Sequence, residues 1–156
     1  MQRFALALAH ALKWPAEPLA VLEFGALLHD IGKILVPRAI LVKPDRLLPE
    51  EWEVLRRHPE DGAKMLAGVD HLLGAMPYVL YHHERWDGRG YPRGLAGTAI
   101  PIEGRMLAVV DSYDAMTSER PYRAPVSADE ARAEILRSSG KQFDPVLAKA
   151  FADLSW

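Results

Sequence analysis

The chain of 156 residues contains no cysteine. Disulfide bonds, iron–sulfur clusters, thiolate zinc sites and cysteine nucleophiles are therefore excluded. Any metal ion bound by this protein has to be held by imidazole and carboxylate groups. The sequence offers six histidines and 21 acidic residues for that purpose.

Long apolar runs and a strong net charge are also missing. No apolar run approaches the roughly 20 residues that cross a bilayer, and the N-terminus lacks the pattern of a signal peptide. We therefore expect a cytoplasmic protein without a membrane segment. The formal net charge is -2, which gives no basic field for binding nucleic acid polymers. A phosphate-bearing ligand would have to be held by local charge.

Apolar residues at helical spacing, without strand-like alternation, predict an all-α protein. The length fits a single domain over residues 1–156, built as a bundle of about eight helices. Residues 35–48 and 85–104 are expected to be ordered loops, and the helix over 18–32 is apolar around nearly its whole circumference, which predicts burial. The expected helices cover residues 1–13, 18–32, 49–58, a stretch ending at 68, 72–84 and 103–117, and two more begin at Ser127 and Asp144.

Three expected helices carry histidine at an end or a bend. These signals are His29-Asp30, His58 and His82-His83, and a fourth is Asp111 in an otherwise apolar helix. A buried, unpaired carboxylate is costly, so Asp111 needs a cation partner if its helix packs inward. Imidazole and carboxylate together suit iron, manganese, zinc or nickel, and Asp30 is the best candidate to bridge two ions.

The paired ligands favour a dinuclear centre. Neighbouring side chains on a helix diverge by about 100°, so they suit two metals or two sides of one centre. Lys33 follows His29 by four residues and Asp30 by three, so on a continued helix its ammonium group would face the same centre. That charge could neutralise a substrate phosphate.

Each signal also has an ordinary structural explanation. The two histidine-containing pairs could be solvated or capping residues at helix ends, and His58 before a proline is typical of a loop. Asp111 could pair with an arginine, and Arg120 and Arg123 could be solvated surface charges. The joint occurrence of all these signals favours a metal site.

Taken together, the motifs resemble the HD-GYP family of the HD metal-dependent phosphohydrolase superfamily. The resemblance spans nearly the whole chain, and its most specific part is the block His82–Pro92. The matching stretches are Leu27–Ile34, Val36-Pro37, Ile40–Pro44, His58-Pro59, His82–Pro92, Gly94-Leu95, Ile100-Pro101, Asp111–Ala115, Ser118–Arg123 and Gln142–Pro145.

This resemblance implies an all-helical domain that hydrolyses cyclic di-GMP to linear pGpG and onward to GMP. It implies a metal centre of iron or manganese, with zinc, nickel or magnesium as alternatives, in which an activated water attacks phosphorus in line. The implied catalytic residues are Asp30 and Lys33. The implied metal ligands are His29, Asp30, His58, His82, His83 and Asp111, and the implied substrate-binding residues are Lys33, Tyr91, Asp114, Arg120 and Arg123.

One departure concerns ligands upstream of the His-Asp pair. Family members carry a histidine there, and three-metal members also a glutamate, at a distance that falls before Met1 in this chain. His10 lies too close to His29 to replace them. We therefore expect an N-terminally truncated first helix and two metal ions rather than three.

Two other functions stay open. The chain could be a catalytically weak or silent module that binds nucleotide or binds diguanylate cyclase domains through the Gly-Tyr-Pro loop. Separately, the chain could form a homodimer. Alternatively, the chain could be a phosphohydrolase for another nucleotide, because the histidine and aspartate set is shared across the superfamily. The Gly90–Pro92 loop and the pair Arg120 and Arg123 favour cyclic di-GMP.

Overall fold

The computed structural model describes residues 1–15, 17–119 and 124–154. These residues form nine α-helices, three short 3-10 helices and no strand, which confirms the predicted all-α fold with about eight helices. The 3-10 helices are η1 (Ile31–Leu35), η2 (Asp70–Ala75) and η3 (Gly97–Ala99). The α-helices are α1 (Gln2–Ala11), α2 (Glu17–Leu28), α3 (Arg38–Leu41), α4 (Pro49–Leu55), α5 (His58–Leu66), α6 (Met76–Tyr81), α7 (Ile102–Thr117), α8 (Ala128–Arg137) and α9 (Pro145–Ala152).

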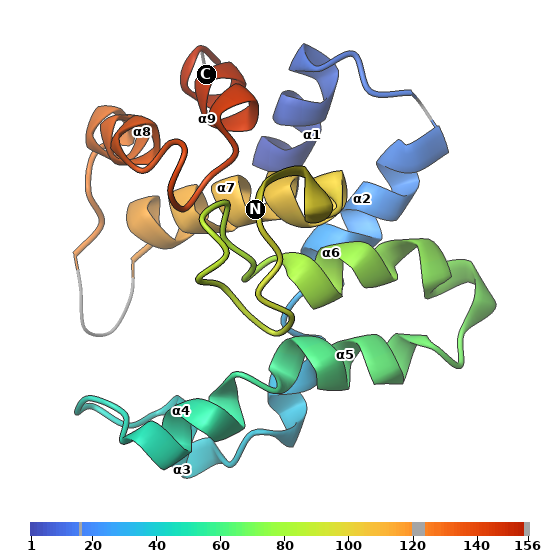
Figure 1. Ribbon diagram of the computed structural model, residues 1–156, viewed down its shortest axis with the longest axis vertical. Helices are drawn as coiled ribbons and strands as arrows, with labels where there is room; N and C mark the ends of the chain where they lie inside the picture. Colours follow the sequence, from blue (N-terminus) through green and yellow to red (C-terminus); the bar gives the residue numbers. More distant parts are fainter. Residues whose placement is uncertain (16, 120–123, 155–156) are drawn as a thin grey trace.

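Helix α7 lies at the centre of the hydrophobic core. In Figure 1, α8, α9 and α1 lie above it and α6 lies below it. The five consecutive residues Met106–Val110 are all buried, so α7 is covered around most of its circumference. The helices around it contribute Phe4 and Leu8 from α1, Leu22 from α2, Ile135 from α8 and Phe151 from α9. Removing these side chains from water is the main source of stability for this part of the fold.

The last two helices begin as the sequence predicts. The Ser127 hydroxyl accepts a hydrogen bond from the Glu130 amide at 3.2 Å, and the Glu130 carboxylate accepts one from the Ser127 amide at 2.9 Å. The Asp144 carboxylate caps α9 by accepting from the Val146 amide at 2.8 Å, with Pro145 in the first turn. The capping box and the Asp-Pro start are thus confirmed.

The second helix is shorter than predicted. Helix α2 ends at Leu28 rather than Gly32, so His29 and Asp30 lie in a turn, and residues 31–35 form η1. The chain leaves α2 here to pack Gly32 against α5. A Cβ atom at this position would lie 2.0 Å from the His58 carbonyl oxygen and 2.6 Å from the Gly62 amide nitrogen. Only glycine permits this contact without displacing the backbone.

Three further boundaries differ from the prediction. The expected helix over 72–84 is divided into η2 and α6 because Pro77, which lacks an amide proton, is tolerated only in the first turn of α6. For the same reason Pro59 follows the first residue of α5, so His58 begins that helix instead of ending α4. The predicted loop over 35–48 contains the short helix α3 after Pro37.

Burial of α2 around its whole circumference is also a wrong prediction. Phe24 is 43% exposed and Leu27 is 64% exposed, whereas Leu22 is fully buried. One face of α2 packs into the core and the opposite face carries apolar side chains at the surface. Among the helices in the described parts of the chain, none is long and apolar enough to span a membrane.

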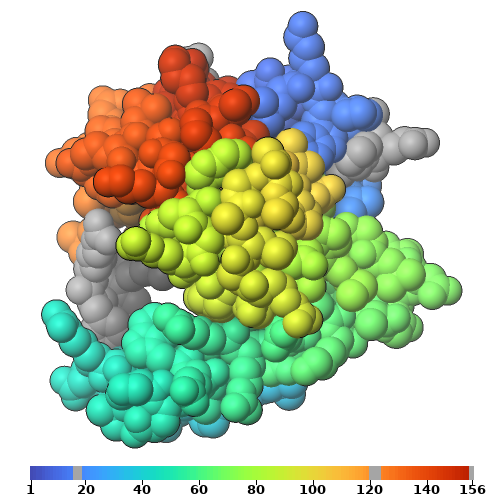
Figure 2. Space-filling model, viewed as in Figure 1, coloured from blue at the N-terminus to red at the C-terminus, as the bar shows by residue number. Residues whose placement is uncertain are grey.

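Residues 31–57, with η1, α3 and α4, form the lower end of the molecule in Figures 1 and 2. In this segment only Gly32 and Val36 are buried. The loop between α6 and α7 covers the face between this lower end and helices α8 and α9 (Figure 2). The candidate site lies where the 31–57 segment joins the rest of the protein.

Candidate metal centre

Four predicted ligands meet where the ends of α2, α5 and α6 converge. Asp30 lies in the turn after α2, His58 is the first residue of α5, and His82 and His83 follow the last residue of α6. One ligand atom of each residue lies within 4.8 Å of those of the other three, which is close enough to share a metal ion. Residues far apart in sequence therefore form one cluster of nitrogen and oxygen donors, which we call the metal cluster.

Three imidazoles are oriented by the backbone of the helix turn that precedes them. Nδ1 of His29, His58 and His82 lies 2.9, 2.7 and 2.8 Å, respectively, from the carbonyl oxygen of the residue three positions earlier. Carbonyls near a helix end have no amide partner within the helix, so they accept the Nδ1 proton. The lone pair of each Nε2 is then directed away from the helix and is available to a metal.

The two carboxylate oxygens of Asp30 face different partners. Oδ1 lies 3.2 Å from Nε2 of His58 and 3.8 Å from Nε2 of His82. Oδ2 lies 3.4 Å from Nε2 of His29, and this nitrogen is also 3.7 Å from Oδ1 of Asp111. Asp30 therefore stands between two sets of donors, His58 with His82 and His29 with Asp111. A carboxylate in such a place can bridge two cations.

One oxygen of Asp30 is buried without a hydrogen bond. Oδ1 is shielded from solvent and has no hydrogen-bond partner of good geometry among the described residues. Such an oxygen is costly unless a cation compensates its charge. The imidazole and carboxylate donors around it suit iron, manganese, zinc or nickel. The residues of the metal cluster thus fit a bound divalent metal ion.

Burial and neighbouring charges set the protonation of the metal cluster. Burial opposes ionisation of Asp30, but the imidazoles of His29, His58 and His82 outweigh this and hold the pKa of its carboxyl far below the usual range. Burial, together with the nearby His82 and His58, lowers the pKa of His83 to about 2. Burial also lowers the pKa of His82. At neutral pH Asp30 is therefore a carboxylate, and His82 and His83 are neutral imidazoles, which are the forms that ligate metals.

Lys33 lies beside the metal cluster, although the predicted helix does not continue to it. It belongs to η1, and its Nζ lies 2.6 Å from Oδ2 of Asp30. The Lys33 side chain is 36% exposed, so its ammonium group reaches the edge of the cluster that faces solvent. An anionic ligand that approaches the cluster would meet this charge.

Tyr91 borders the metal cluster through His83. The two rings are stacked, with 4.7 Å between their centroids and 25° between their planes. The Tyr91 amide also donates a hydrogen bond to the His83 carbonyl oxygen at 3.2 Å. This approach depends on Gly90, because a Cβ atom there would lie 2.4 Å from the Arg85 amide nitrogen and 2.6 Å from the Glu84 Cα.

Glu84, to which the sequence analysis assigns no role, holds the loop that carries Tyr91. Its side chain is almost fully buried, and its carboxylate accepts hydrogen bonds from the amides of Arg93 at 2.6 Å and Leu95 at 3.0 Å. The available signal in the sequence is an acidic residue between two histidines and a glycine-rich loop. Its partners are backbone amides, which no side-chain pattern reveals.

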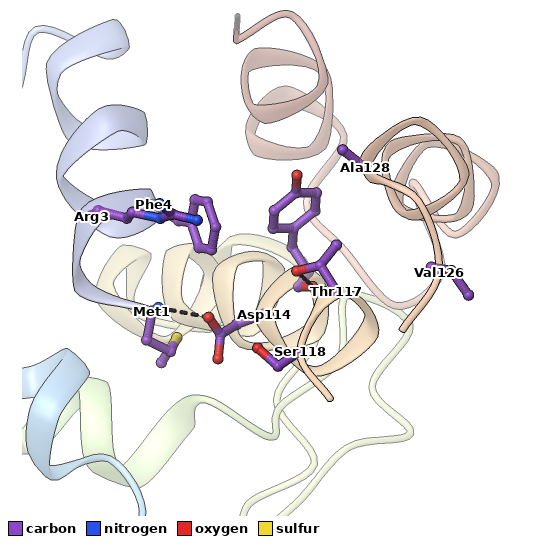
Figure 3. Close-up of a pocket in the computed structure, with 9 residues that line it drawn as sticks. Met1, Arg3, Phe4, Asp114, Thr117, Ser118, Val126 and Ala128 are labelled. Carbon is purple, nitrogen blue, oxygen red and sulfur yellow. Dashed lines mark hydrogen bonds and ion pairs between the residues drawn. The ribbon is translucent and has the colours of Figure 1, made fainter. Parts of the chain in front are cut away.

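The remaining predicted substrate residues do not lie in the metal cluster. Asp114 is one turn beyond Asp111 on α7, but its Oδ1 lies 2.6 Å from the N-terminal amine of Met1 (Figure 3). Both residues line a pocket of about 670 Å³ between α1 and α7. Arg120 and Arg123 lie outside the described residues.

A smaller pocket of about 130 Å³ borders the metal cluster directly. Its lining includes His82, His83, Asp111, Ser112 and Gln142. The Gln142 Nε2 lies 3.4 Å from the Ser112 hydroxyl oxygen. Its position makes the small pocket, rather than the larger one near Asp114, relevant to chemistry at the cluster.

Comparison with known proteins shows that the chain matches the model of a protein family. The model, described as HD domain, matches residues 1–147. A cyclic di-GMP phosphodiesterase of Thermotoga maritima is 48% identical over 136 residues, which cover 85% of this chain and 37% of that protein. A cyclic di-GMP phosphodiesterase response regulator of Xanthomonas campestris pv. campestris is 42% identical over 148 residues, which cover 93% of this chain and 39% of that protein.

Other similar proteins act on a different cyclic dinucleotide or share the fold. A 3'3'-cGAMP-specific phosphodiesterase of Vibrio cholerae is 36% identical over 154 residues, which cover 96% of this chain and 30% of that protein. Among solved structures, an HDG"Y"P protein from Bdellovibrio bacteriovorus superposes with a TM-score of 0.77 at 21% identity, over 97% of this chain and 49% of that chain. The chain spans less than half the length of each of these relatives.

Proposed function

The chain belongs to the HD domain family, and on this premise we propose that it is a metal-dependent phosphodiesterase that hydrolyses cyclic di-GMP to pGpG or GMP. Relatives named as cyclic di-GMP phosphodiesterases are 42–48% identical to it over most of its length. The sequence carries the Gly90-Tyr91-Pro92 block of the HD-GYP group, and that resemblance agrees with the family match.

The position of Asp30 between two sets of donors is the observation that carries this proposal. Its Oδ1 faces His58 and His82, and its Oδ2 faces His29. We propose that the site holds two divalent cations, iron or manganese, with Asp30 shared between them and Asp111 on the His29 side. When bound, such a pair of ions would polarise a phosphate and would lower the pKa of a bound water, which could then attack phosphorus as hydroxide.

The protein groups around the metal cluster have separate tasks in this proposal. Backbone carbonyls hold the imidazoles of His58 and His82 in place, and the Lys33 ammonium group donates a hydrogen bond to one oxygen of Asp30, so the donor atoms are positioned before any ligand binds. The Lys33 ammonium group stabilises negative charge on the phosphoryl oxygens as the bond to the leaving oxygen breaks. Tyr91, stacked on His83, contacts the substrate at the rim of the cluster. Asp114, Arg120 and Arg123 remain proposed substrate contacts from the sequence.

The comparisons also support a second candidate substrate, 3'3'-cGAMP. Several phosphodiesterases specific for 3'3'-cGAMP are also similar to this chain, with identities between 36% and 40%. Proteins named as cyclic di-GMP phosphodiesterases have higher identities to this chain, 48% and 44%, so cyclic di-GMP remains the first candidate. Cytoplasmic location, diguanylate cyclase partners and a homodimer remain predictions, as does a catalytically silent module.

The test is hydrolysis by the purified chain. The protein is loaded anaerobically with Fe²⁺ or Mn²⁺, its metal content is measured, and products from cyclic di-GMP and 3'3'-cGAMP are separated by chromatography. Asp30→Asn keeps the shape of the side chain but removes its charge, so it should lower metal content and reduce hydrolysis at least about a hundredfold. The matched control is Asp45→Asn, at an exposed aspartate in the adjoining segment 31–57, which should behave as wild type.

Two results would reject the proposal. One is hydrolysis by Asp30→Asn at the wild-type rate. The other is a wild-type chain that binds two metal ions per molecule and leaves both cyclic dinucleotides intact, which would favour the silent binding module.

A further inference from the structure

Arg56 lies next to Tyr91, one ring away from the metal cluster. Its guanidinium carbon is 5.3 Å from the centroid of the Tyr91 ring, and Tyr91 in turn stacks on His83. The same guanidinium carbon is 5.8 Å from the ring of Trp52, four residues earlier. The side chains of His83, Tyr91, Arg56 and Trp52 therefore follow one another from the cluster outward, and this row joins the loop after α6 to α4.

The Arg56 guanidinium is not used by the fold. The ion pairs and hydrogen bonds within the described residues do not include its side chain, whose contacts are with the two aromatic rings. Arg56 is exposed, and Trp52 keeps 44% of its surface in contact with solvent. An arginine whose N–H donors lack protein acceptors, beside an exposed indole ring, is available to a ligand.

We propose that Trp52, Arg56 and Tyr91 form a subsite for a guanine base of the cyclic dinucleotide, an inference that rests on the proposed function. A base stacks on aromatic side chains, and an arginine donates two parallel hydrogen bonds to the O6 and N7 acceptors of guanine. A phosphate group would be satisfied by the guanidinium alone and has no use for the exposed indole. The combination of aromatic surface and free donors therefore favours a base.

The chemistry of the base edge makes this subsite selective. Guanine presents two acceptors to the guanidinium, whereas adenine presents one acceptor and one donor. Arginine has only donors, so it cannot satisfy the adenine amino group. We therefore expect Arg56 to strengthen binding of guanine-containing cyclic dinucleotides and to contribute little to binding of cyclic di-AMP.

The experiment compares Arg56→Gln with Arg57→Gln. Both arginines are exposed and adjacent, but only Arg56 contacts the two rings. Steady-state hydrolysis gives KM and kcat for cyclic di-GMP, and competition gives the affinity for cyclic di-AMP. Arg56→Gln should raise KM for cyclic di-GMP about tenfold and change kcat less than about threefold, as expected for a base contact away from the reacting phosphate. The affinity for cyclic di-AMP should change less than about threefold, and Arg57→Gln should match wild type.

Two further variants separate stacking and geometry from charge. Trp52→Ala should raise KM for cyclic di-GMP, because one stacking surface is lost. Arg56→Lys keeps the charge but not the planar fork, so it should restore little of the affinity. Thermal melts of each variant establish that the chain remains folded.

The outcomes distinguish this subsite from the proposed function. Equal weakening of cyclic di-GMP and cyclic di-AMP binding by Arg56→Gln would assign Arg56 to phosphate and overturn the subsite. An Arg56→Gln variant with wild-type KM would also overturn it, while hydrolysis by the wild-type chain would still support the proposed function. A wild-type chain that neither binds nor cleaves cyclic di-GMP would overturn both.

Discussion

Helix α7 and the segment 31–57 are stabilised in opposite ways. All five residues from Met106 to Val110 are buried in the core around α7, whereas residues 31–57 bury only Gly32 and Val36. Neither of the two hydrophobic clusters among the described residues has a buried member from this segment. The segment nevertheless exposes large apolar side chains, among them Ile34, Leu35 and Leu41.

The difference indicates how the candidate site is built. The metal cluster lies where the 31–57 segment meets the well-packed helices, with Asp30 just before the segment and His58 just after it. Apolar packing therefore fixes one side of the cluster, and close backbone contact and polar groups fix the other. We infer that a bound metal would stabilise the 31–57 segment more than the core around α7.

The largest expected effect comes from the core. Phe151 is fully buried on α9, and its ring lies 5.0 Å from that of Tyr113. Phe151→Ala should lower the free energy of unfolding by about 3 to 5 kcal/mol, because it removes apolar contacts and leaves a cavity. Leu41→Ala in α3, where the leucine is 45% exposed, should cost no more than about 0.5 kcal/mol. Denaturant titrations of the two variants test this comparison, and similar losses would contradict it.

Metal binding should stabilise the 31–57 segment and its ends more than the core around α7. A metal at 100 times its dissociation constant stabilises the folded state by about 2.7 kcal/mol. Addition of Mn²⁺ to metal-free protein should slow amide exchange most strongly in residues 28–36 and 56–66, which carry or flank Asp30 and His58. Protection in α7 should change less, because its packing does not require the ion. Asp30→Asn should remove the protection that Mn²⁺ gives. A uniform rise of protection over the whole wild-type chain would contradict preferential stabilisation of these two stretches by the metal.

Gly32 tests the backbone contact that attaches the segment. A methyl group at this position would meet the His58 carbonyl oxygen at 2.0 Å, so η1 and α5 must separate. Gly32→Ala should cost about 1 to 3 kcal/mol of stability and weaken metal binding, because Asp30 moves with η1. Gly68→Ala is the matched control, since a Cβ atom at Gly68 meets nothing within 4 Å. Equal metal affinity in Gly32→Ala and wild type would mean that this contact does not position Asp30.

The helix content and the cluster residues could be predicted from the sequence because both depend on side-chain pattern. Helical spacing identified α7, and the capping box at Ser127 identified the start of α8. The candidate metal ligands were predicted from histidines and aspartates that occur together in a known motif. That these residues converge could be expected from the resemblance, but the orientation of Asp30 between two donor sets could not.

Contacts made by the backbone could not be predicted in the same way. The end of α2 at Leu28 depends on Gly32 packing against the carbonyl of His58, and a glycine reveals no partner in the sequence. Glu84 binds two amides of its own loop, and Arg56 reaches an aromatic ring 35 residues away. Asp114 lies 2.6 Å from the Met1 amine, and its predicted contact with substrate stays a prediction. These interactions depend on tertiary structure rather than on local pattern.

The smallest expected effect comes from an ion pair within the 31–57 segment. Nζ of Lys43 lies 2.8 and 2.6 Å from the two carboxylate oxygens of Glu51. The hydrogen bond from Lys43, aided by the Leu48 amide, lowers the pKa of Glu51 below its ordinary value. A group whose pKa is lower in the folded state stabilises the fold above its unfolded pKa. This contribution is lost as the pH falls through the folded pKa.

Lys43→Met should therefore raise the pKa of Glu51 toward its ordinary value, as measured by carboxyl ¹³C NMR titration. Because the pair is on the surface, Tm at pH 7 should fall by no more than about 2 °C, and the difference should vanish in acid as Glu51 is protonated in both proteins. Lys64→Met, which removes a lysine 3.2 Å from Asp61, should leave the titration of Glu51 unchanged. A large loss of Tm in Lys43→Met would mean that surface ion pairs hold the 31–57 segment. A small one leaves Gly32 and the metal cluster as the main attachments of the segment to the core.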